Sequence, residues 1–474
     1  MFKKLTFIIT ASVLLFTLIF FLPGCNFSRQ EPIYSPEVPL SFDVVVWGSG
    51  TAAVAAALEA DDNGAQVLLL PEKLPLLYDL DLSWKEGLLL ADPEEMKPKG
   101  EAEASEVAEE REDEHLVPAL KKMLLQQGAG LNNPVLLQVF LDELWQVEEW
   151  FSRWDELFLQ QVEAGHPLHP YLYYLDGPLE ENALKKEILS QLQRRPIKIE
   201  TGFQIKEIML DQHKGVESIV VSREAEEDRE EKEIFTQAFI IATGGFGGSS
   251  SLLQKFAPQP LAHFSLSDSR GEYLSLAQSL QLELVQASFL HYHLLQENST
   301  RESFHAGFLP KNGLFLKKDP YGEYSFFTFA DYWQQSFNNR SFWQAGELYY
   351  LFHLTDTKTH LEKNLLIKPE LLPTAGDLQE KGFEPALVRE ISRLLSPPYG
   401  FISLRAGVKY TLGGLPIDAK GQVQKDGEIV PGLFAAGEAA GGLHGQAALQ
   451  GAVLSENIVF GLIAGREAAA WSRR

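Results

Sequence analysis

The sequence is poor in cysteine and in positive charge. Cys25 is the one cysteine among 474 residues, which excludes an intramolecular disulfide, a multi-cysteine metal or iron–sulfur site and a covalent haem motif. Lys and Arg number 41 against 65 Asp and Glu, a formal net charge of -24. Because a phosphate backbone needs a basic stripe, we expect no nucleic-acid partner. With 45% apolar residues, the chain should bury large cores and fold as two or three domains.

The N-terminal segment predicts export and a membrane tether. Two lysines precede an apolar run from Leu5 to Leu22, and Cys25 follows a small residue at its end. Residues 1–25 resemble the signal segment of a bacterial lipoprotein, in which the cysteine is lipidated after cleavage. An uncleaved helix is the alternative, since about 18 apolar residues nearly span a bilayer. Either interpretation predicts a membrane-anchored protein outside the bacterial cytoplasm, with 26–41 as an extended linker.

A dinucleotide-binding turn follows the linker. Phe42 to Trp47 is an apolar run typical of a buried parallel strand, and the small residues from Ala52 to Ala60 favour a helix. Glycines between a strand and a helix let the backbone approach a pyrophosphate, which the helix N-terminus also attracts. Glu72, after a second strand at Val67 to Leu70, is the expected ligand of the adenosine ribose. The expected phosphate-binding residues are Gly48, Gly50, Thr51, Ala52 and Ala53.

Two later stretches favour FAD over NAD. Phe239 to Gly245 is an apolar strand ending in small residues, and there the chain can pass close to a cofactor, at Ala242, Thr243 and Gly244. Gly432 to Glu438 is another such strand, followed by a glycine-rich turn and a helical run. A helix starting near Leu449 would direct its N-terminus at an anionic group of the cofactor.

Together with Thr411-Leu412-Gly413-Gly414, these segments resemble the FAD-binding family that includes fumarate reductase and succinate dehydrogenase flavoproteins. The resemblance covers about 42–470. It implies an α/β fold, with a Rossmann-like FAD-binding domain of the GR2 type that is split in sequence and an inserted α+β capping domain. The expected parts are 42–251 (FAD-binding domain, N-terminal part, with an acidic insertion at 92–114), 252–385 (capping and substrate domain) and 386–474 (FAD-binding domain, C-terminal part).

The resemblance also implies bound FAD, a small-molecule substrate and an unidentified electron donor. It places the acidic side chain of Glu438 beside the flavin ribityl or ribose hydroxyls, a role that suits an acceptor. The other cofactor contacts that it implies are Glu272, Gly437, and the backbone of Val453 and Leu454.

The groups with which fumarate reductases bind a dicarboxylate are missing. Ala448 stands at the arginine of the family's His-Gly-x-Asn-Arg string, and Ala447 stands at its asparagine. Tyr410 stands where the family often carries histidine, while His444 is retained. These two are the expected catalytic residues, with Tyr410 as a proton donor. A tyrosine packed on the flavin and a structural histidine are the alternatives.

Two functions stay open at this point. One is an FAD-dependent oxidoreductase that reduces or forms a carbon–carbon double bond in a substrate other than fumarate. The other is an FAD-binding protein with little or no catalysis, because the cofactor motifs are kept and the proton-delivery groups are not. Elsewhere, apolar periodicity predicts helices over 116–163, and strands are expected at 203–210, 219–222 and 234–241 with a hairpin tip at 224–233.

Overall fold

The computed structural model divides the chain into residues 1–40 and a unit of residues 41–474. Cys25 and the predicted acidic insertion at 92–114 lie outside the described residues. Within the described part, no helix is both long and apolar enough to cross a membrane. The structure describes residues 41–72, 76–77, 88–90, 116–153, 158–161, 168–176, 183–223, 231–257, 267–296, 303–304, 309–310, 312–319, 321–328, 347–354 and 369–474.

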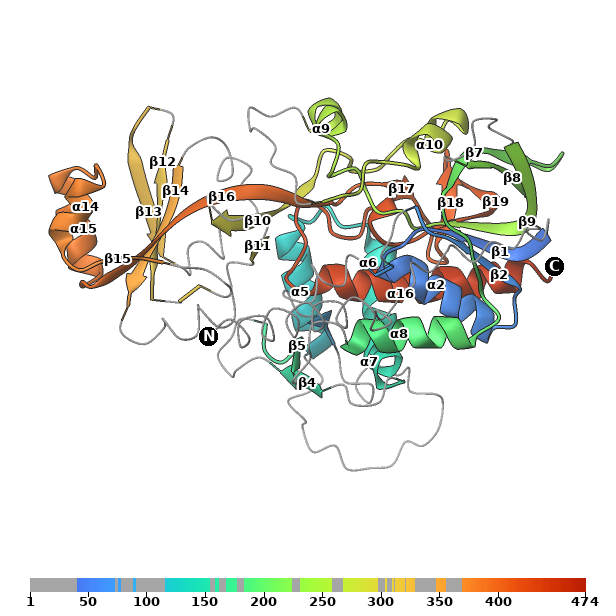
Figure 1. The fold of residues 1–474 in the computed structure, drawn as a ribbon, viewed down its shortest axis with the longest axis horizontal. Helices are drawn as coiled ribbons and strands as arrows, with labels where there is room; N and C mark the ends of the chain where they lie inside the picture. The colour runs from blue at the N-terminus through green and yellow to red at the C-terminus, as the bar shows by residue number, and fades with distance from the viewer. Residues whose placement is uncertain are drawn as a thin grey trace, which may run out of the picture. The chain divides into compact units, whose positions relative to one another are not determined.

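An eight-stranded sheet joins the N-terminal and C-terminal parts of the chain (Figure 1). Its central path runs β18-β19-β9-β1-β2-β6, and β7 and β8 extend it through β9. The strands β2, β1, β9 and β19 are parallel neighbours, and only β9 lies between β1, the first of the four along the chain, and β19, the last. The bounds are β1 Ser41–Trp47, β2 Val67–Leu70, β6 Lys198–Ile199, β7 Phe203–Leu210, β8 Val216–Arg223, β9 Glu231–Ile241, β18 Gln422–Lys425 and β19 Glu428–Ala435.

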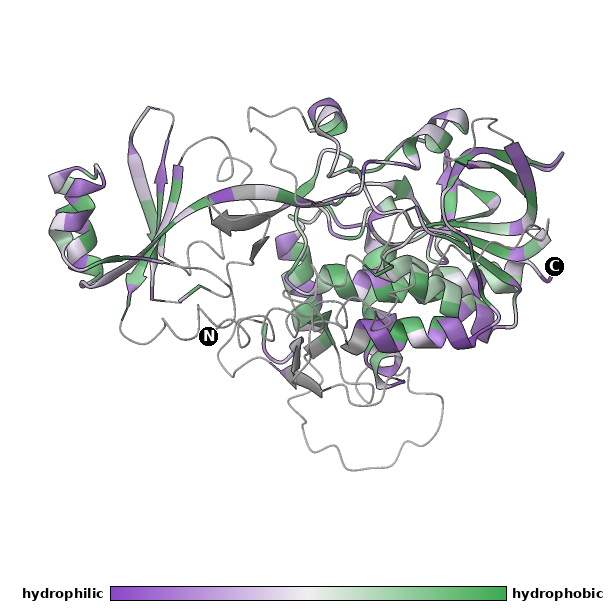
Figure 2. Ribbon diagram, in the orientation of Figure 1, coloured by the Kyte–Doolittle hydropathy of each residue, from purple (hydrophilic) through white to green (hydrophobic). Residues whose placement is uncertain are grey.

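Two helices made largely of small and apolar residues pack against each other beside this sheet. They are α2, Thr51–Asp62, and α16, Ala452–Trp471. A Cβ at Gly461 would lie 2.7 Å from the Ala52 carbonyl oxygen, so the two backbones touch where side chains are smallest. Every residue of α16 up to Gly465 is buried. Figure 2 shows that α2 and α16 are largely hydrophobic, as their buried position requires.

A helical layer and a small sheet complete the N-terminal part. The Asn133 side chain caps α6 by accepting from Val135 N at 2.9 Å, and Pro134 occupies the first turn. The expectation of helix up to residue 163 is wrong at its end, because 158–161 form a strand that pairs with β5. The bounds are α5 Leu116–Gln127, α6 Pro134–Glu143, α7 Trp145–Ser152, α8 Ala183–Arg194, β3 Leu88–Leu89, β4 Phe158–Gln161 and β5 Leu172–Asp176.

A second sheet of seven strands has the path β11-β10-β16-β14-β12-β13, with β15 paired to β16. The 13-residue strand β16 pairs with β14 and β15 over its first half and with β10 over its second half (Figure 1). The predicted boundary at 385/386, between the capping domain and the C-terminal part of the FAD-binding domain, stays a prediction. Strand β16 follows that boundary in sequence, and hydrogen bonding places it in the same sheet as β10 and β14. The bounds are β10 Leu290–Gln296, β11 Ser303–Phe304, β12 Leu314–Lys318, β13 Tyr324–Thr328, β14 Glu347–His353, β15 Glu370–Leu372, β16 Tyr399–Thr411, α14 Ala375–Glu380 and α15 Pro385–Leu394.

Several short elements belong to neither of the two large sheets. The helices α9, Ser250–Phe256, and α10, Leu274–Ser279, follow β9 along the chain. Near the C-terminus, β17, Leu415–Pro416, pairs in parallel with β20, Ala440–Gly441, just after the 3₁₀ turn η4 at Gly437–Ala439.

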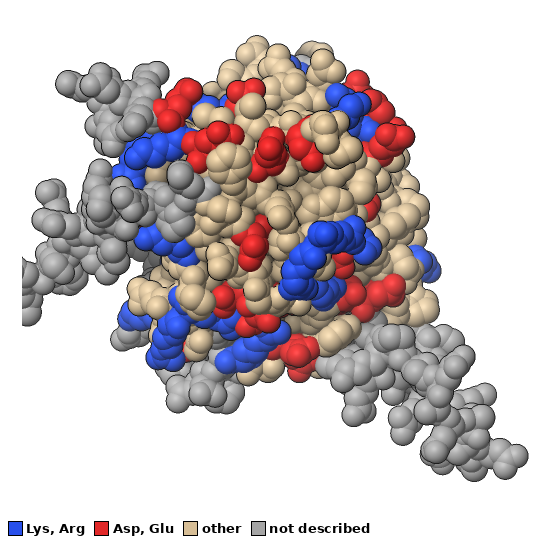
Figure 3. Space-filling view, turned by 90° about the vertical axis from the view of Figure 1, so that its right-hand side faces the viewer, with Lys and Arg blue, Asp and Glu red and all other residues tan. Residues whose placement is uncertain are grey.

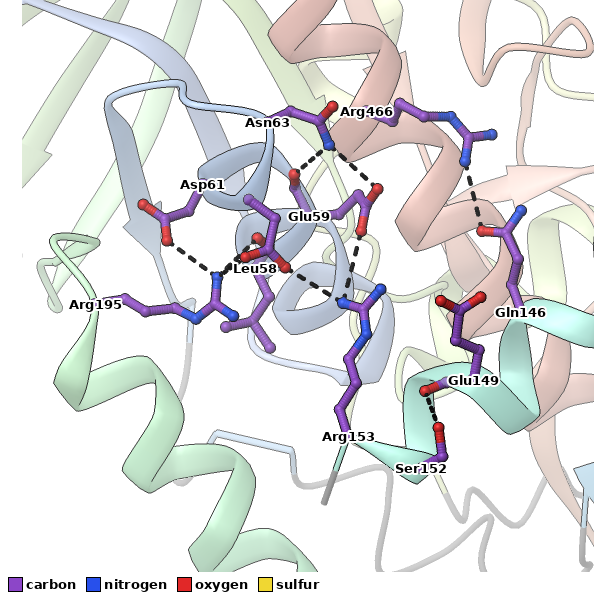
Figure 4. Close-up of polar contacts among 11 residues, drawn as sticks. Leu58, Glu59, Asp61, Asn63, Gln146, Glu149, Ser152, Arg153, Arg195 and Arg466 are labelled. Atoms are coloured by element: carbon purple, nitrogen blue, oxygen red, sulfur yellow. Dashed lines mark hydrogen bonds and ion pairs between the residues drawn. The ribbon is translucent and has the colours of Figure 1, made fainter. Parts of the chain in front are cut away.

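Charged side chains join the C-terminal end of α2 to its neighbours (Figure 4). Arg195 binds Asp61 at 3.1 Å and also Asp62, which Arg153 contacts at 3.3 Å. Arg153 also lies 3.9 Å from Glu59. Among the described residues on the face in Figure 3, acidic and basic side chains are interspersed, and none of the basic clusters there forms a continuous stripe.

Candidate FAD-binding and catalytic site

The glycine turn after β1 brings three segments together. The Gly48 N–H donates to the Leu70 carbonyl at 3.0 Å. A Cβ at Gly48 would overlap the Ala242 carbonyl and lie 2.9 Å from the Ala53 Cβ. Gly48 therefore lets the first helix and the segment after β9 close on the turn, and any larger residue would separate them.

The N-terminus of α2 is built from backbone alone. Gly50 is the N-cap, and its side-chain-free position leaves the first N–H groups of the helix without a side-chain cap. Ser49 and Thr51 are fully buried on either side. Such an arrangement of N–H groups at a buried helix end attracts a phosphate.

Glu72 lies beside this turn although Pro71 separates it from the second strand. The Ser49 hydroxyl donates to Glu72 Oε1 at 2.7 Å. The carboxylate predicted to bind the ribose is therefore adjacent to the turn predicted to bind the pyrophosphate, as one dinucleotide requires.

Glu438 is the centre of a second buried cluster. Its Oε1 accepts from the Thr411 N–H at 2.7 Å and from the Thr411 hydroxyl at 3.0 Å. A Cβ at Gly245 would lie 2.5 Å from the same oxygen. Three regions distant in sequence thus converge on one carboxylate that is 9% exposed.

The two predicted halves of the cofactor site meet directly. A Cβ at Gly437 would lie 2.8 Å from the Ala52 Cβ and 2.8 Å from Asn457 Oδ1. Val453 and Leu454, in the first turn of α16, are both buried. The helix starts at Ala452, three residues later than expected, because Gly451 turns the chain with a φ of +80°.

Glu272 occupies a different setting from Glu438. Its carboxylate accepts from the Arg270 N–H, at 3.1 Å to Oε2 and 3.3 Å to Oε1. The loop that carries it is joined to the cluster around Glu438, because the Gly271 N–H donates to the Gly245 carbonyl at 2.9 Å. Its predicted contact with the cofactor stays a prediction.

Tyr410 and His444 share one carboxylate. The Tyr410 hydroxyl donates to Glu456 Oε2 at 3.1 Å and lies 3.2 Å from Asn457 Oδ1. His444 Nε2 lies 2.7 Å from the same Glu456 oxygen. All four side chains are at most 6% exposed. Sequence reasoning identified the first pair and missed Glu456 and Asn457, although polar residues within an otherwise apolar helix are a readable signal.

The ring of Tyr410 lies in an apolar cluster. Leu412, Ala448 and Val453 pack with it, and partly buried Phe289 lies against them. Ala448, at the family's arginine position, therefore belongs to the same apolar cluster as Tyr410. His291 is the strand partner of Tyr410 across β10 and β16 and is 2% exposed.

A loop between α5 and α6 holds the glycine-rich turn that carries His444. The Asn132 side chain donates to the Leu443 carbonyl at 2.9 Å, and the Asn133 N–H donates to the Gly442 carbonyl at 2.8 Å. The Gln446 N–H donates to the Gly128 carbonyl at 3.1 Å. The position of His444 is therefore fixed from outside its own turn.

The residues present fit FAD. Within the described part of the chain, the fully buried Thr243 hydroxyl has no hydrogen-bond partner. Thr243 directly follows Ala242, whose carbonyl lies against Gly48, so this hydroxyl belongs to the segment that closes on the glycine turn. Burying a hydroxyl without a partner costs about 1–3 kcal/mol, so a bound polar group is expected beside it. A buried helix end, two carboxylates and this hydroxyl together match the phosphates and sugar hydroxyls of a dinucleotide.

Comparison with known proteins agrees with this geometry. A family model described as "FAD binding domain" matches residues 43–454. The chain is 26% identical to the NADH:fumarate oxidoreductase of Klebsiella pneumoniae (strain 342) over 92% of its own length and 48% of that protein, so it spans about half of this relative. It is 24% identical to the fumarate reductase (cytochrome) of Shewanella frigidimarina, over 91% of this chain and 78% of that one. The urocanate reductase of Eggerthella lenta is also 24% identical, over 90% and 74% of the two chains.

Solved structures share the fold. An open conformation of a flavocytochrome c3 fumarate reductase superposes with a TM-score of 0.67 at 17% identity, covering 93% of this chain and 80% of that chain. The 3-ketosteroid-Δ4-(5α)-dehydrogenase of Rhodococcus jostii RHA1 gives a TM-score of 0.63 at 16% identity, covering 91% of this chain and 98% of that chain. The expected α/β fold is confirmed.

Proposed function

The chain belongs to the FAD binding domain family, and from that premise we propose that it is an FAD-dependent oxidoreductase that reduces or forms a carbon–carbon double bond in a substrate other than fumarate. The observation that carries the proposal is the position of Tyr410. It shares a buried apolar cluster with Ala448 and Val453, and its hydroxyl donates a hydrogen bond to the carboxylate that His444 also contacts.

The apolar cluster argues against a dicarboxylate. Binding two carboxylates calls for paired, forked donors such as guanidinium groups. Ala448 is fully buried against Tyr410, and neighbouring Ala447 is 6% exposed. Neither alanine side chain can donate a hydrogen bond. A second carboxylate buried beside them would therefore lose its hydrogen bonds to water and gain none from these side chains.

The names of the relatives suggest a substrate class. Fumarate, urocanate and acrylate, which occur in the names of relatives from Shewanella frigidimarina, Eggerthella lenta and Vibrio harveyi, all have an alkene conjugated to a carboxylate. We propose that the substrate here is an alkene activated by one carbonyl or carboxyl group, an enone or enoate. A single activating group suits a site with an apolar wall.

FAD, when bound, supplies or accepts the hydride. Reduction of the alkene then needs one proton at the neighbouring carbon, and the Tyr410 hydroxyl is the group to give it. Glu456 lies between Tyr410 and His444, at 3.1 Å and 2.7 Å. Both are hydrogen-bond distances, so a proton can return to the phenol along this line. In the dehydrogenating direction the same groups remove the proton.

The test follows reoxidation of the chemically reduced flavoprotein without oxygen, using fumarate, urocanate, acrylate and a simple enone as acceptors. We expect an enoate or enone to reoxidise the flavin faster than fumarate does. Tyr410→Phe should lower that rate about 10²–10⁴-fold with unchanged FAD content. Tyr399→Phe is the matched control, because Tyr399 is buried at the other end of the same strand and its hydroxyl bonds to the Leu395 carbonyl.

Two results would count against the proposal. An undiminished rate in the Tyr410→Phe variant would remove the phenol from the reaction. If no acceptor reoxidises the wild-type flavin above the buffer rate, the second function, FAD binding with little or no catalysis, is favoured instead.

We also propose that the protein is anchored to a bacterial membrane through Cys25 and receives electrons from a separate donor. The support is the sequence of residues 1–25, which lie outside the described part of the chain. Membrane fractionation of the wild type and of Cys25→Ser tests the anchor. The N-terminus of the membrane-bound wild type decides between the two anchors: a lipidated Cys25 as the first residue is the expected result, and an intact Met1 with no lipid on Cys25 would argue for an uncleaved helix.

A further inference from the structure

Tyr273 is a fully buried polar side chain that none of the roles above uses. Its side chain is 0% exposed, and within the described residues its hydroxyl has no hydrogen-bond partner. It follows Glu272 directly and forms the N-cap of α10. An unbonded phenol in this position costs about 1–3 kcal/mol unless another group bonds to it.

The surroundings of Tyr273 tie it to the cofactor cluster. Two residues earlier, Gly271 donates to the Gly245 carbonyl at 2.9 Å, and Gly245 lies against Glu438 Oε1. The pKa of the Tyr273 phenol is raised far above its ordinary value of 10.0 by burial, and further by the negative charges of Glu438 and Glu272. The segment that carries Tyr273 is therefore joined to Glu438 through Gly245, and a phenol that keeps its proton at neutral pH can donate a hydrogen bond.

A neutral donor beside a carboxylate selects a particular kind of ligand atom. A phosphate oxygen would be repelled by Glu438, whereas an aliphatic hydroxyl can accept from one group and donate to the other. FAD carries such hydroxyls on its ribityl chain and on its adenosine ribose. We propose that the Tyr273 hydroxyl donates to one of these hydroxyls, which in turn donates to Glu438, so that Tyr273 is a cofactor-binding residue.

The proposal does not depend on the substrate, and its test reads FAD binding rather than activity. The chain is prepared as the holoprotein, freed of flavin and titrated with FAD by fluorescence. Tyr273→Phe removes one oxygen and should raise the FAD dissociation constant about 2- to 12-fold, the equivalent of one hydrogen bond of about 0.5–1.5 kcal/mol. In the flavin-free protein the same change should leave the unfolding midpoint equal or higher, because it removes an unbonded hydroxyl.

Tyr350→Phe is the matched control. Tyr350, in strand β14 of the seven-stranded sheet, is also 0% exposed, but its hydroxyl donates to the Pro310 carbonyl. Its replacement should lower stability with and without flavin and leave the FAD dissociation constant unchanged. If Tyr273→Phe behaves like Tyr350→Phe, or leaves FAD binding at the wild-type value, the proposal is wrong.

Two further arms locate the bond. ADP, which has the adenosine ribose and lacks the ribityl chain, should bind Tyr273→Phe and wild type equally if the ribityl chain is the partner, and more weakly to the variant if the ribose is. Glu438→Gln is then combined with Tyr273→Phe. A bridging hydroxyl makes the two losses of FAD affinity non-additive, whereas strictly additive losses would exclude the shared hydroxyl.

Discussion

Replacing Gly437 with alanine should separate the two halves of the site. Gly437 has a φ of +62°, and an alanine held there costs about 1–2 kcal/mol. Its Cβ would also lie 2.8 Å from the Ala52 Cβ and 2.8 Å from Asn457 Oδ1, and overpacking of this kind costs about 1–3 kcal/mol. The two effects together predict a loss of about 2–5 kcal/mol.

Gly427→Ala separates the two effects. Gly427 has a similar φ of +85°, but nothing lies within 4 Å of a Cβ built on it. Only the conformational cost of about 1–2 kcal/mol should remain. Urea unfolding of both variants, with and without FAD, gives the comparison. Because Ala52 lies in the first turn of α2, we also expect Gly437→Ala, and not Gly427→Ala, to weaken FAD binding at least about tenfold, equivalent to 1.4 kcal/mol. Equal effects of the two substitutions would refute close packing between Gly437 and α2.

Two predictions concern pH. Burial raises the pKa of Glu59 above its ordinary 4.5 despite Arg153 and Arg466, so its contribution to stability is complete below pH 4.5 and is lost as the pH rises through the raised pKa. The stability of Glu59→Gln relative to wild type, measured by urea unfolding, should therefore grow from acid to neutral pH, and a shrinking difference would contradict the burial effect. Burial likewise raises the pKa of Tyr350 above 10.0, so stability is lost above that pH, and Tyr350→Phe should reduce the alkaline loss by about 1.4 kcal/mol per pH unit. An identical alkaline slope in the two proteins would show that Tyr350 does not contribute to it.

The cofactor-binding framework could be predicted because its signals are local. The run Val67 to Leu70 forms β2 with the expected bounds, and Phe203 to Leu210 forms β7. The small residues between β1 and α2 are likewise recognisable as a short local motif, although Gly48 also packs against Ala242 from a distant segment. The strand at 158–161 could not be predicted in this way, because it is defined by its pairing with β5 rather than by its own periodicity.

The buried cluster around Tyr410 was predictable only in part. Tyr410 and His444 stand at recognisable positions of a motif, whereas Glu456 lies in a helix that is apolar on all sides. Which polar residue of that helix faces Tyr410 depends on the rotation of α16 against β16, and this is set by the packing of Gly461 on α2. Tertiary contacts of this kind leave no periodic trace in the sequence.

Gly50→Glu tests most directly the central claim that the glycine turn and the C-terminal glycine block hold one FAD. The change puts a carboxylate at the N-cap of α2, where the pyrophosphate is expected to lie. Gly64→Glu is its control, just beyond the other end of the helix, where the only expected cost is that of a side chain at a φ of +80°, because nothing lies within 4 Å of its Cβ. The measurement is the FAD released per folded chain. We expect one FAD per chain from the wild type and Gly64→Glu, and none from a folded Gly50→Glu, whereas a full complement of FAD in Gly50→Glu would contradict the claim.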